Sequence, residues 1–280
     1  MTKTIAVRSI PLLFLIFSLV INAQEFQGKA YYMSKTSVDM SNFERPNMSE
    51  DQKKRMAERL KQMFEKTFIL DFNKVESVYK LDEKLETPGQ GQGGRFGSVM
   101  SGAIDGVTYK NIKSKEILSE HELFGKLFLI KDDIPELDWK MTGETKQIGG
   151  YTCFKATAIK TWKDFDMSSF RRPSDTTEDK DDEAEQEAEQ PITITAWYTM
   201  QIPVNHGPDF YQGLPGLILE INTDKTTMLC TKIILNPEDK ATIKKPSKGK
   251  EVTKEEYVDI ATSKFQEMRE NFRRGGGSRR

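Results

Sequence analysis

Polar and apolar residues alternate along most of the chain, with the two-residue period that is typical of β-strands. The clearest case is residues 192–200, where every second residue from Ile192 to Met200 is apolar or aromatic. Such alternation indicates an antiparallel strand with one buried face. Comparable runs predict further strands at residues 26–35, 67–72, 75–79, 107–111, 115–119, 123–131, 151–162, 217–222 and 226–235.

Two segments instead carry apolar residues at helical spacing. Residues 49–66 begin with Ser49 and Gln52, and residues 253–272 begin with Thr253 and Glu256, both pairs in the spacing of a capping box. The predicted fold class is therefore α+β, mainly β. We expect a curved antiparallel sheet or half-barrel, with one helix in the N-terminal half and one at the C-terminus.

The N-terminus has the pattern of a secretory signal peptide. Lys3 and Arg8 precede an apolar run from Ile10 to Ile21, and the small residue Ala23 follows it. This pattern predicts cleavage after residue 23 and export to the periplasm or beyond the cell. The apolar run is too short to cross a bilayer comfortably, although an N-terminal membrane anchor is the alternative interpretation. No cysteine follows the run, so the exported protein is expected not to be lipidated or membrane-spanning.

The remaining chain is interpreted as one β-rich domain, residues 24–250, followed by a helix at 251–273 and a basic tail at 274–280. Two segments interrupt the domain. Residues 86–102 are rich in glycine and predict a flexible loop. Residues 174–190 hold nine carboxylates and one lysine, which predicts a disordered insertion; a calcium-binding or partner-binding segment is the alternative.

Composition excludes several functional classes. The 280 residues carry a formal net charge of −1, which argues against a nucleic-acid-binding protein. Two cysteines and two histidines are too few for a disulfide scaffold or a four-thiolate zinc site. No phosphate-binding loop or nucleophile motif is present, so we expect a protein that is not an enzyme and needs no cofactor.

Two side-chain sets remain as candidates for chemistry. Cys153 and Cys230 both lie within predicted strands, where they form either a disulfide or two separate buried thiols. Met200 and His206 offer soft ligands that suit Cu(I), but a loop histidine without metal is the simpler interpretation, so no metal site is predicted.

The segment from Trp197 to Ile221 predicts two strands joined by a stiff loop. Prolines at 203, 208 and 215 fix φ, and the sequence Leu214-Pro215-Gly216-Leu217 has the composition of a type II turn. A loop of this kind is either a packed structural corner or a surface presented for binding.

This loop also carries a resemblance to a known family. The hexapeptide from Gly213 to Ile218 resembles the signature of the GLPGLI family, exported proteins of the Bacteroidota, and residues 138–140, 144–156 and 196–199 are similar to its pattern. The acidic insertion at 174–190 departs from that pattern. The motif residues expected to bind or dock are Trp197, Tyr198, Pro203, Gly207, Pro208, Gly213, Leu214, Pro215, Gly216, Leu217 and Ile218.

The resemblance implies an exported, β-rich binding, carrier or envelope accessory protein of uncharacterised activity. Its expected partners are an outer-membrane receptor of the TonB-dependent type or a small apolar ligand, the latter by analogy with the curved sheets of lipoprotein carriers. Asp175-Thr176-Thr177 also resembles the O-glycosylation motif of this phylum, with Thr176 as the acceptor.

Overall fold

The computed structural model describes residues 26–37, 48–82, 99, 101–160, 191–238 and 243–275. Within these residues, twelve strands form a single sheet in the order β12-β6-β5-β4-β3-β2-β1-β11-β10-β9-β8-β7. The strands are β1 (Gln27–Thr36), β2 (Glu65–Asn73), β3 (Glu76–Leu81), β4 (Val107–Asn111), β5 (Glu116–Leu123), β6 (Lys126–Asp133), β7 (Lys140–Ile148), β8 (Tyr151–Lys160), β9 (Ile192–Thr199), β10 (Leu217–Asn222), β11 (Thr226–Leu235) and β12 (Lys250–Val252).

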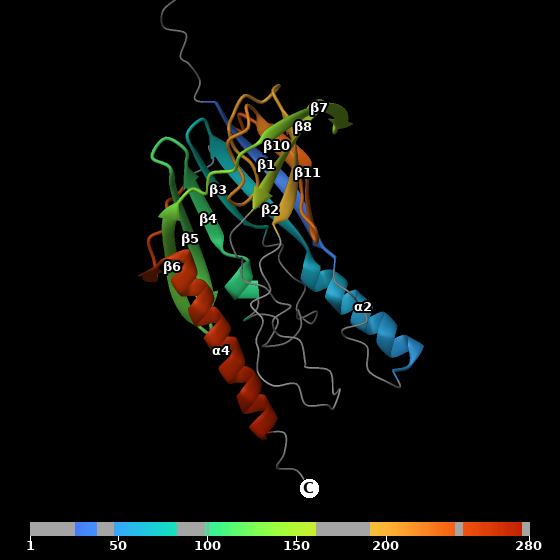
Figure 1. Cartoon of the computed structure of the whole chain (residues 1–280), viewed down its shortest axis with the longest axis vertical. Helices are drawn as coiled ribbons and strands as arrows, with labels where there is room; N and C mark the ends of the chain where they lie inside the picture. Colours follow the sequence, from blue (N-terminus) through green and yellow to red (C-terminus); the bar gives the residue numbers. More distant parts are fainter. Residues whose placement is uncertain are drawn as a thin grey trace, which may run out of the picture.

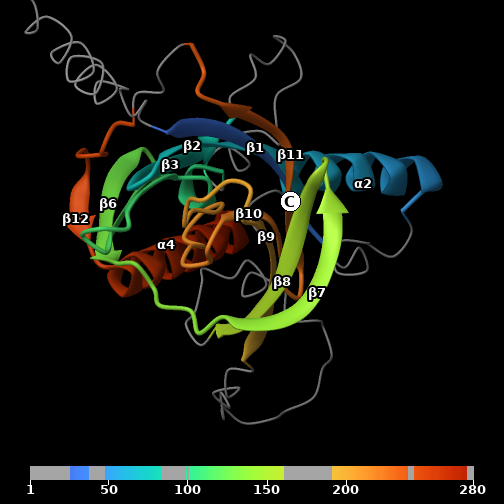
Figure 2. The same cartoon turned by 90° about the horizontal axis from the view of Figure 1, so that it is seen from above.

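The sheet is strongly curved and open, since β12 and β7 form its two edges and do not pair with each other (Figure 2). This confirms the predicted mainly-β class. The sheet is antiparallel except at one edge, where the three residues of β12 run parallel to β6. The predicted antiparallel sheet is thus mixed at this one edge, because the chain returns to β6 by a crossover from β11 rather than by a hairpin.

Two helices extend from the same end of the sheet (Figure 1). Helix α2 (Glu50–Phe64) begins at the predicted capping box: the Gln52 amide donates to Ser49 Oγ, and the Ser49 amide donates to Gln52 Oε1. Helix α4 (Lys254–Gly275) begins with the matching pair of bonds between Thr253 and Glu256 and extends slightly beyond the predicted end. Both predicted helix starts are confirmed.

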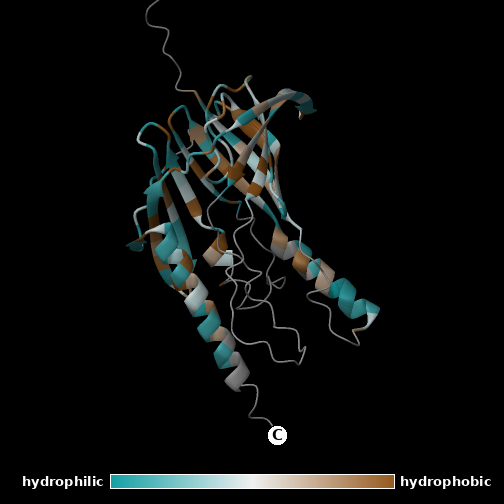
Figure 3. Cartoon of the chain, in the orientation of Figure 1, coloured by the Kyte–Doolittle hydropathy of each residue, from teal (hydrophilic) through white to brown (hydrophobic). Residues whose placement is uncertain are grey.

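Helix α4 packs against β6 through a cluster that includes Phe128, Ile130, Tyr257 and Phe265. The helices are largely hydrophilic, whereas apolar residues concentrate in the sheet (Figure 3). No helix within the described ranges is long and apolar enough to span a membrane.

Register across the sheet sets up rows of side chains on one face. Residues directly opposite each other in antiparallel strands project to the same face. One row crosses five strands and lies beside the loop that joins β9 to β10; its members are Gly28, Phe72, Ser77, Lys110 and Ile117. The Phe72 ring occupies the space where a side chain on Gly28 would lie, with ring atoms only 2.4–2.9 Å from an added Cβ. The adjacent row on the same face runs through Ala30, Leu70, Tyr79, Thr108 and Ser119.

Two local predictions are corrected. Strand β7 does not alternate in sequence and was not expected, because it is an exposed edge strand that needs no buried face. Residues 101–104 form a helical turn that overlaps the end of the predicted loop 86–102, and Ala103 in this turn is buried and accepts a 3.0 Å hydrogen bond from Tyr257 Oη at its carbonyl. The predicted signal peptide, the acidic segment 174–190 with Thr176, and residues 276–280 lie outside the described residues.

Candidate functional site

The loop at residues 200–216, called the motif loop here, lies inside the curve of the sheet (Figure 2). Six of its larger side chains are buried, namely Ile202, Val204, His206, Phe210, Tyr211 and Leu214. Of the motif residues, Pro203, Gly213 and Pro215 are exposed, whereas Gly207, Pro208, Gly216, Leu217 and Ile218 are buried. The motif loop is thus a packed corner, and its predicted role as a presented docking surface is not supported by this burial. Tyr198 is buried beneath it, and Trp197 is half-buried on β9.

Side chains from distant parts of the chain hold the backbone of the motif loop. Lys110 Nζ, on β4, donates to the carbonyl oxygens of Gly207 at 2.8 Å and Tyr211 at 2.9 Å. Trp139 Nε1 donates to Gln212 O at 2.9 Å. Tyr32 Oη, on β1, donates to Ile218 O at 2.7 Å, just after the loop. These bonds satisfy carbonyl groups that burial would otherwise leave unpaired.

Glycine is needed at positions 213 and 216 of the hexapeptide for two different structural reasons. Gly213 has φ +95°, which side-chain-bearing residues rarely adopt. Gly216 does not have positive φ; instead, a Cβ there would lie 2.1 Å from Thr199 O. The predicted type II turn is therefore wrong. The Gly216 amide donates to Leu214 O at 2.8 Å in a tighter turn, because β9 passes directly against this backbone.

Lys110 is fully buried, and this burial lowers the pKa of its ammonium to about 7, with partial compensation from the negative charge of Asp209. Asp209 itself has φ +47° and accepts a 3.4 Å hydrogen bond from Thr108 Oγ1. Sequence reasoning missed both residues. Lys110 stands between Tyr109 and Asn111 in a short strand, where a lysine ordinarily indicates the solvent face.

His206 is also fully buried, with its ring centroid 6.5 Å from that of Phe72. Burial, with the nearby charge of Lys110, lowers its pKa to about 3, so the ring is neutral. Met200 is half exposed at the turn after β9. The two candidate copper ligands thus lie in different environments, which gives no support to a shared metal site. The described residues contain no group of three or more His, Cys, Asp or Glu side chains arranged to bind a metal ion.

Cys153 and Cys230 are both free thiols in buried positions. Cys153 lies on β8 and Cys230 on β11, with β9 and β10 between them. Three strand spacings amount to roughly 14 Å along the sheet, whereas a disulfide needs Cα atoms about 4.4–6.8 Å apart. Of the two alternatives that the sequence left open, the structure has two separate buried thiols and not the disulfide. Burial raises the pKa of Cys153 to about 11 and that of Cys230 to about 12.

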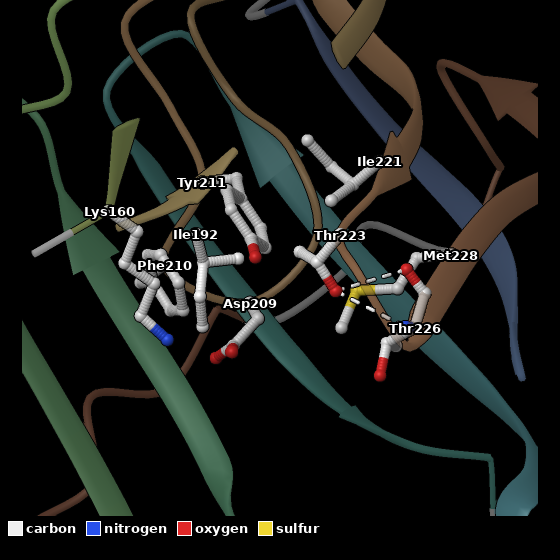
Figure 4. A pocket seen from close by; sticks show the side chains of 9 residues that line it. All are labelled: Lys160, Ile192, Asp209, Phe210, Tyr211, Ile221, Thr223, Thr226 and Met228. Carbon is white, nitrogen blue, oxygen red and sulfur yellow. Dashed lines mark hydrogen bonds between the residues drawn. The ribbon is translucent and has the colours of Figure 1, made fainter. Parts of the chain in front are cut away.

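A cavity of about 160 Å³ lies beside the motif loop. In Figure 4, Lys160, Ile192 and Phe210 form one side and Thr223, Thr226 and Met228 the other, with Asp209 and Tyr211 between them. Ile221 completes the lining. Hydrogen bonds between Thr223 and the backbone of Thr226 fix the turn on one wall. The Lys160 ammonium lies 5.6 Å from the centre of the Phe210 ring.

Comparison with known proteins supports a family likeness over part of the chain. Residues 139–220 match the model of a family described as a protein of unknown function, Porph_ging. This range includes Trp139, the motif loop and most of the segment that resembles the GLPGLI pattern. The match does not confirm the GLPGLI name. No curated protein matches the chain.

Among solved structures, the chain is similar to PNGF-II crystallised in two space groups. The C2 structure has a TM-score of 0.47 and 14% sequence identity, covering 84% of this chain and 32% of PNGF-II. The P21 structure gives a TM-score of 0.47 and 15% identity, covering 84% and 33%. The chain thus spans about a third of the length of PNGF-II.

Proposed function

We propose that this protein is an exported, non-enzymatic binding protein that holds a small, mainly apolar ligand in the cavity beside the motif loop. One observation carries the proposal: the cavity combines apolar lining residues, namely Ile192, Phe210, Ile221 and Met228, with two charged side chains, Lys160 and Asp209. Ligand sites commonly pair an apolar lining with a few polar groups that orient the ligand.

The size of the cavity limits the ligand. A cavity of about 150 Å³ lined by aliphatic and aromatic side chains accommodates benzene, and this cavity is close to that volume. A carrier of long acyl chains needs a groove of several hundred Å³. The ligand class favoured here is therefore a short aliphatic or single-ring molecule, rather than the lipid cargo that the carrier analogy suggests.

Ligand-observed NMR with three small probes tests the proposal. Pentanoate, pentylamine and 1-pentanol share an apolar body and differ in the group that would meet Lys160 or Asp209. We expect saturation transfer to at least one probe. Ile192 lines the cavity and is 38% exposed, so Ile192→Arg should block binding without altering the core.

The matched control is Ile159→Arg, because Ile159 is exposed on the neighbouring strand and does not line the cavity. Wild-type protein and this control should give equal signals, and Ile192→Arg should give none. Absence of transfer to all three probes in the wild type, or an undiminished signal in Ile192→Arg, would refute the proposal.

A further inference from the structure

A group of buried polar atoms beneath the motif loop has no hydrogen-bond partner. Among the residues that the structure describes, the Ser77 hydroxyl and both ring nitrogens of His206 are buried and have no hydrogen bond of good geometry, although the Asn73 backbone lies near the His206 ring. His206 and Ser77 are each 0% exposed. Leaving a buried polar group unpaired destabilises the folded state, so several such groups in one place require an explanation.

Strand register and one hydrogen bond place both residues close to Lys110 in the fold. Ser77 lies directly opposite Lys110 in the β3–β4 pair, so their side chains share a face. Lys110 donates to the carbonyl of Gly207, the residue that follows His206. Phe72 lies opposite Ser77 on the other side and also packs near the His206 ring. Ser77, Lys110 and His206 therefore surround the same part of the core.

The chemistry of these groups restricts what can satisfy them. A neutral imidazole has one nitrogen that donates and one that accepts, and a hydroxyl does both. An anion would satisfy only the donors and leave the accepting nitrogen unpaired. A cation would satisfy only the acceptors and would be repelled by the Lys110 ammonium. Water both donates and accepts, and buried water commonly pairs with such groups.

We propose that Ser77, Lys110 and His206 form a binding site for ordered internal water, which joins β3 and β4 to the inner side of the motif loop. Lys110 uses two of its three N–H groups on Gly207 O and Tyr211 O, so the third is available to a water molecule. In this arrangement, the buried water is a structural component of the corner formed by the motif loop.

A high-resolution crystal structure of the full chain, with crystals also soaked in bromide, tests the site directly. We expect a water peak within hydrogen-bonding distance of a His206 ring nitrogen and Ser77 Oγ, with no anomalous signal from bromide. An empty space between these atoms would overturn the inference. A bromide peak there would also overturn it, by identifying the site as one for anions.

Thermal unfolding of His206→Phe gives a second, independent readout. Phenylalanine keeps a planar aromatic ring, although a larger one, and removes both nitrogens. If water satisfies them, the substitution breaks bonds and should lower Tm by about 3 °C or more. If the site is dry, the substitution removes unpaired polar atoms from the core, and an increase in Tm would contradict the inference.

Discussion

The Lys110 ammonium donates a 2.8 Å hydrogen bond to the carbonyl oxygen of Gly207, 97 positions later in the chain. A second bond from the same ammonium to Tyr211 O makes Lys110 a fixed support for the motif loop. Because Lys110 is fully buried, its charge is costly, yet the two carbonyls it satisfies would be costly to leave unpaired. The balance between these two effects can be measured.

We expect Lys110→Met to destabilise the protein at pH 7. The substitution leaves the Gly207 and Tyr211 carbonyls without a donor, at about 1–3 kcal/mol each, and removes the penalty of burying an ammonium. We expect the lost hydrogen bonds to dominate, with a net loss of about 1–3 kcal/mol in the free energy of unfolding. Chemical denaturation measures it, with Lys113→Met as the control because Lys113 is exposed on a turn.

Because the pKa of Lys110 is lowered, the difference in stability between wild type and Lys110→Met should depend on pH. Its pKa is about 7 in the folded protein, against 10.5 for an unperturbed lysine. Between these values the unfolded chain binds more protons, so the contribution of Lys110 to stability rises as pH increases from 7 to 10. The difference between wild type and Lys110→Met should therefore widen over this range. A difference that stays constant with pH would show that Lys110 is not desolvated.

The two histidines should make the protein sensitive to acid. Burial lowers the pKa of His206 to about 3 and that of His121 to about 4, from 6.5. Below pH 6.5 the histidines are protonated in the unfolded chain but stay neutral in the folded chain. The free energy of unfolding should therefore decrease by about 1.4 kcal/mol for each histidine and each unit by which the pH is lowered. His206→Phe should have a shallower slope between pH 6 and 4 than wild type. Equal slopes would contradict the burial of this ring.

Local patterns in the sequence accounted for much of the fold. The capping boxes predicted the first residues of both helices, and the alternation of polar and apolar residues predicted most strands. Such prediction works because a half-buried strand or an amphipathic helix has apolar residues at regular intervals in its sequence. Strand β7 left no such record, since nearly all of its side chains are exposed. The parallel pairing of β12 depends on a long return of the chain that no local pattern describes.

The candidate site was less predictable. The sequence pointed to the motif loop but not to the side chains that hold it. Lys110 and Trp139 lie about 100 and 70 positions away from the carbonyls they bind, and only the register of the sheet brings them there. The state of the cysteines stayed open for the same reason: mid-strand cysteines are compatible with bonding until the strand order places two strands between them.

The cysteines should behave as protected thiols. Both are free and buried, and their raised pKa values keep them protonated at neutral pH. We expect intact mass spectrometry without reductant to show two free thiols, with alkylation by iodoacetamide slow in the native protein and rapid in denaturant. Adding dithiothreitol should leave Tm unchanged. A fall in Tm with reductant would reveal a disulfide that contradicts the strand order.

The close approach of Gly216 to β9 should make it the less replaceable glycine of the hexapeptide. In Gly216→Ala, the new methyl would lie 2.1 Å from Thr199 O and 2.6 Å from its carbon, which are backbone atoms of β9 and cannot rotate away. We expect a loss of about 3 kcal/mol or more in the free energy of unfolding.

Gly213→Ala is the matched comparison within the same hexapeptide. Its new methyl would meet nothing nearer than 3.7 Å, so only the positive φ opposes it, at a cost of about 1–2 kcal/mol. Urea denaturation of the two variants separates steric overlap from backbone strain. If Gly213→Ala were the more damaging of the two, the close approach of Thr199 could not be the main reason for glycine at position 216.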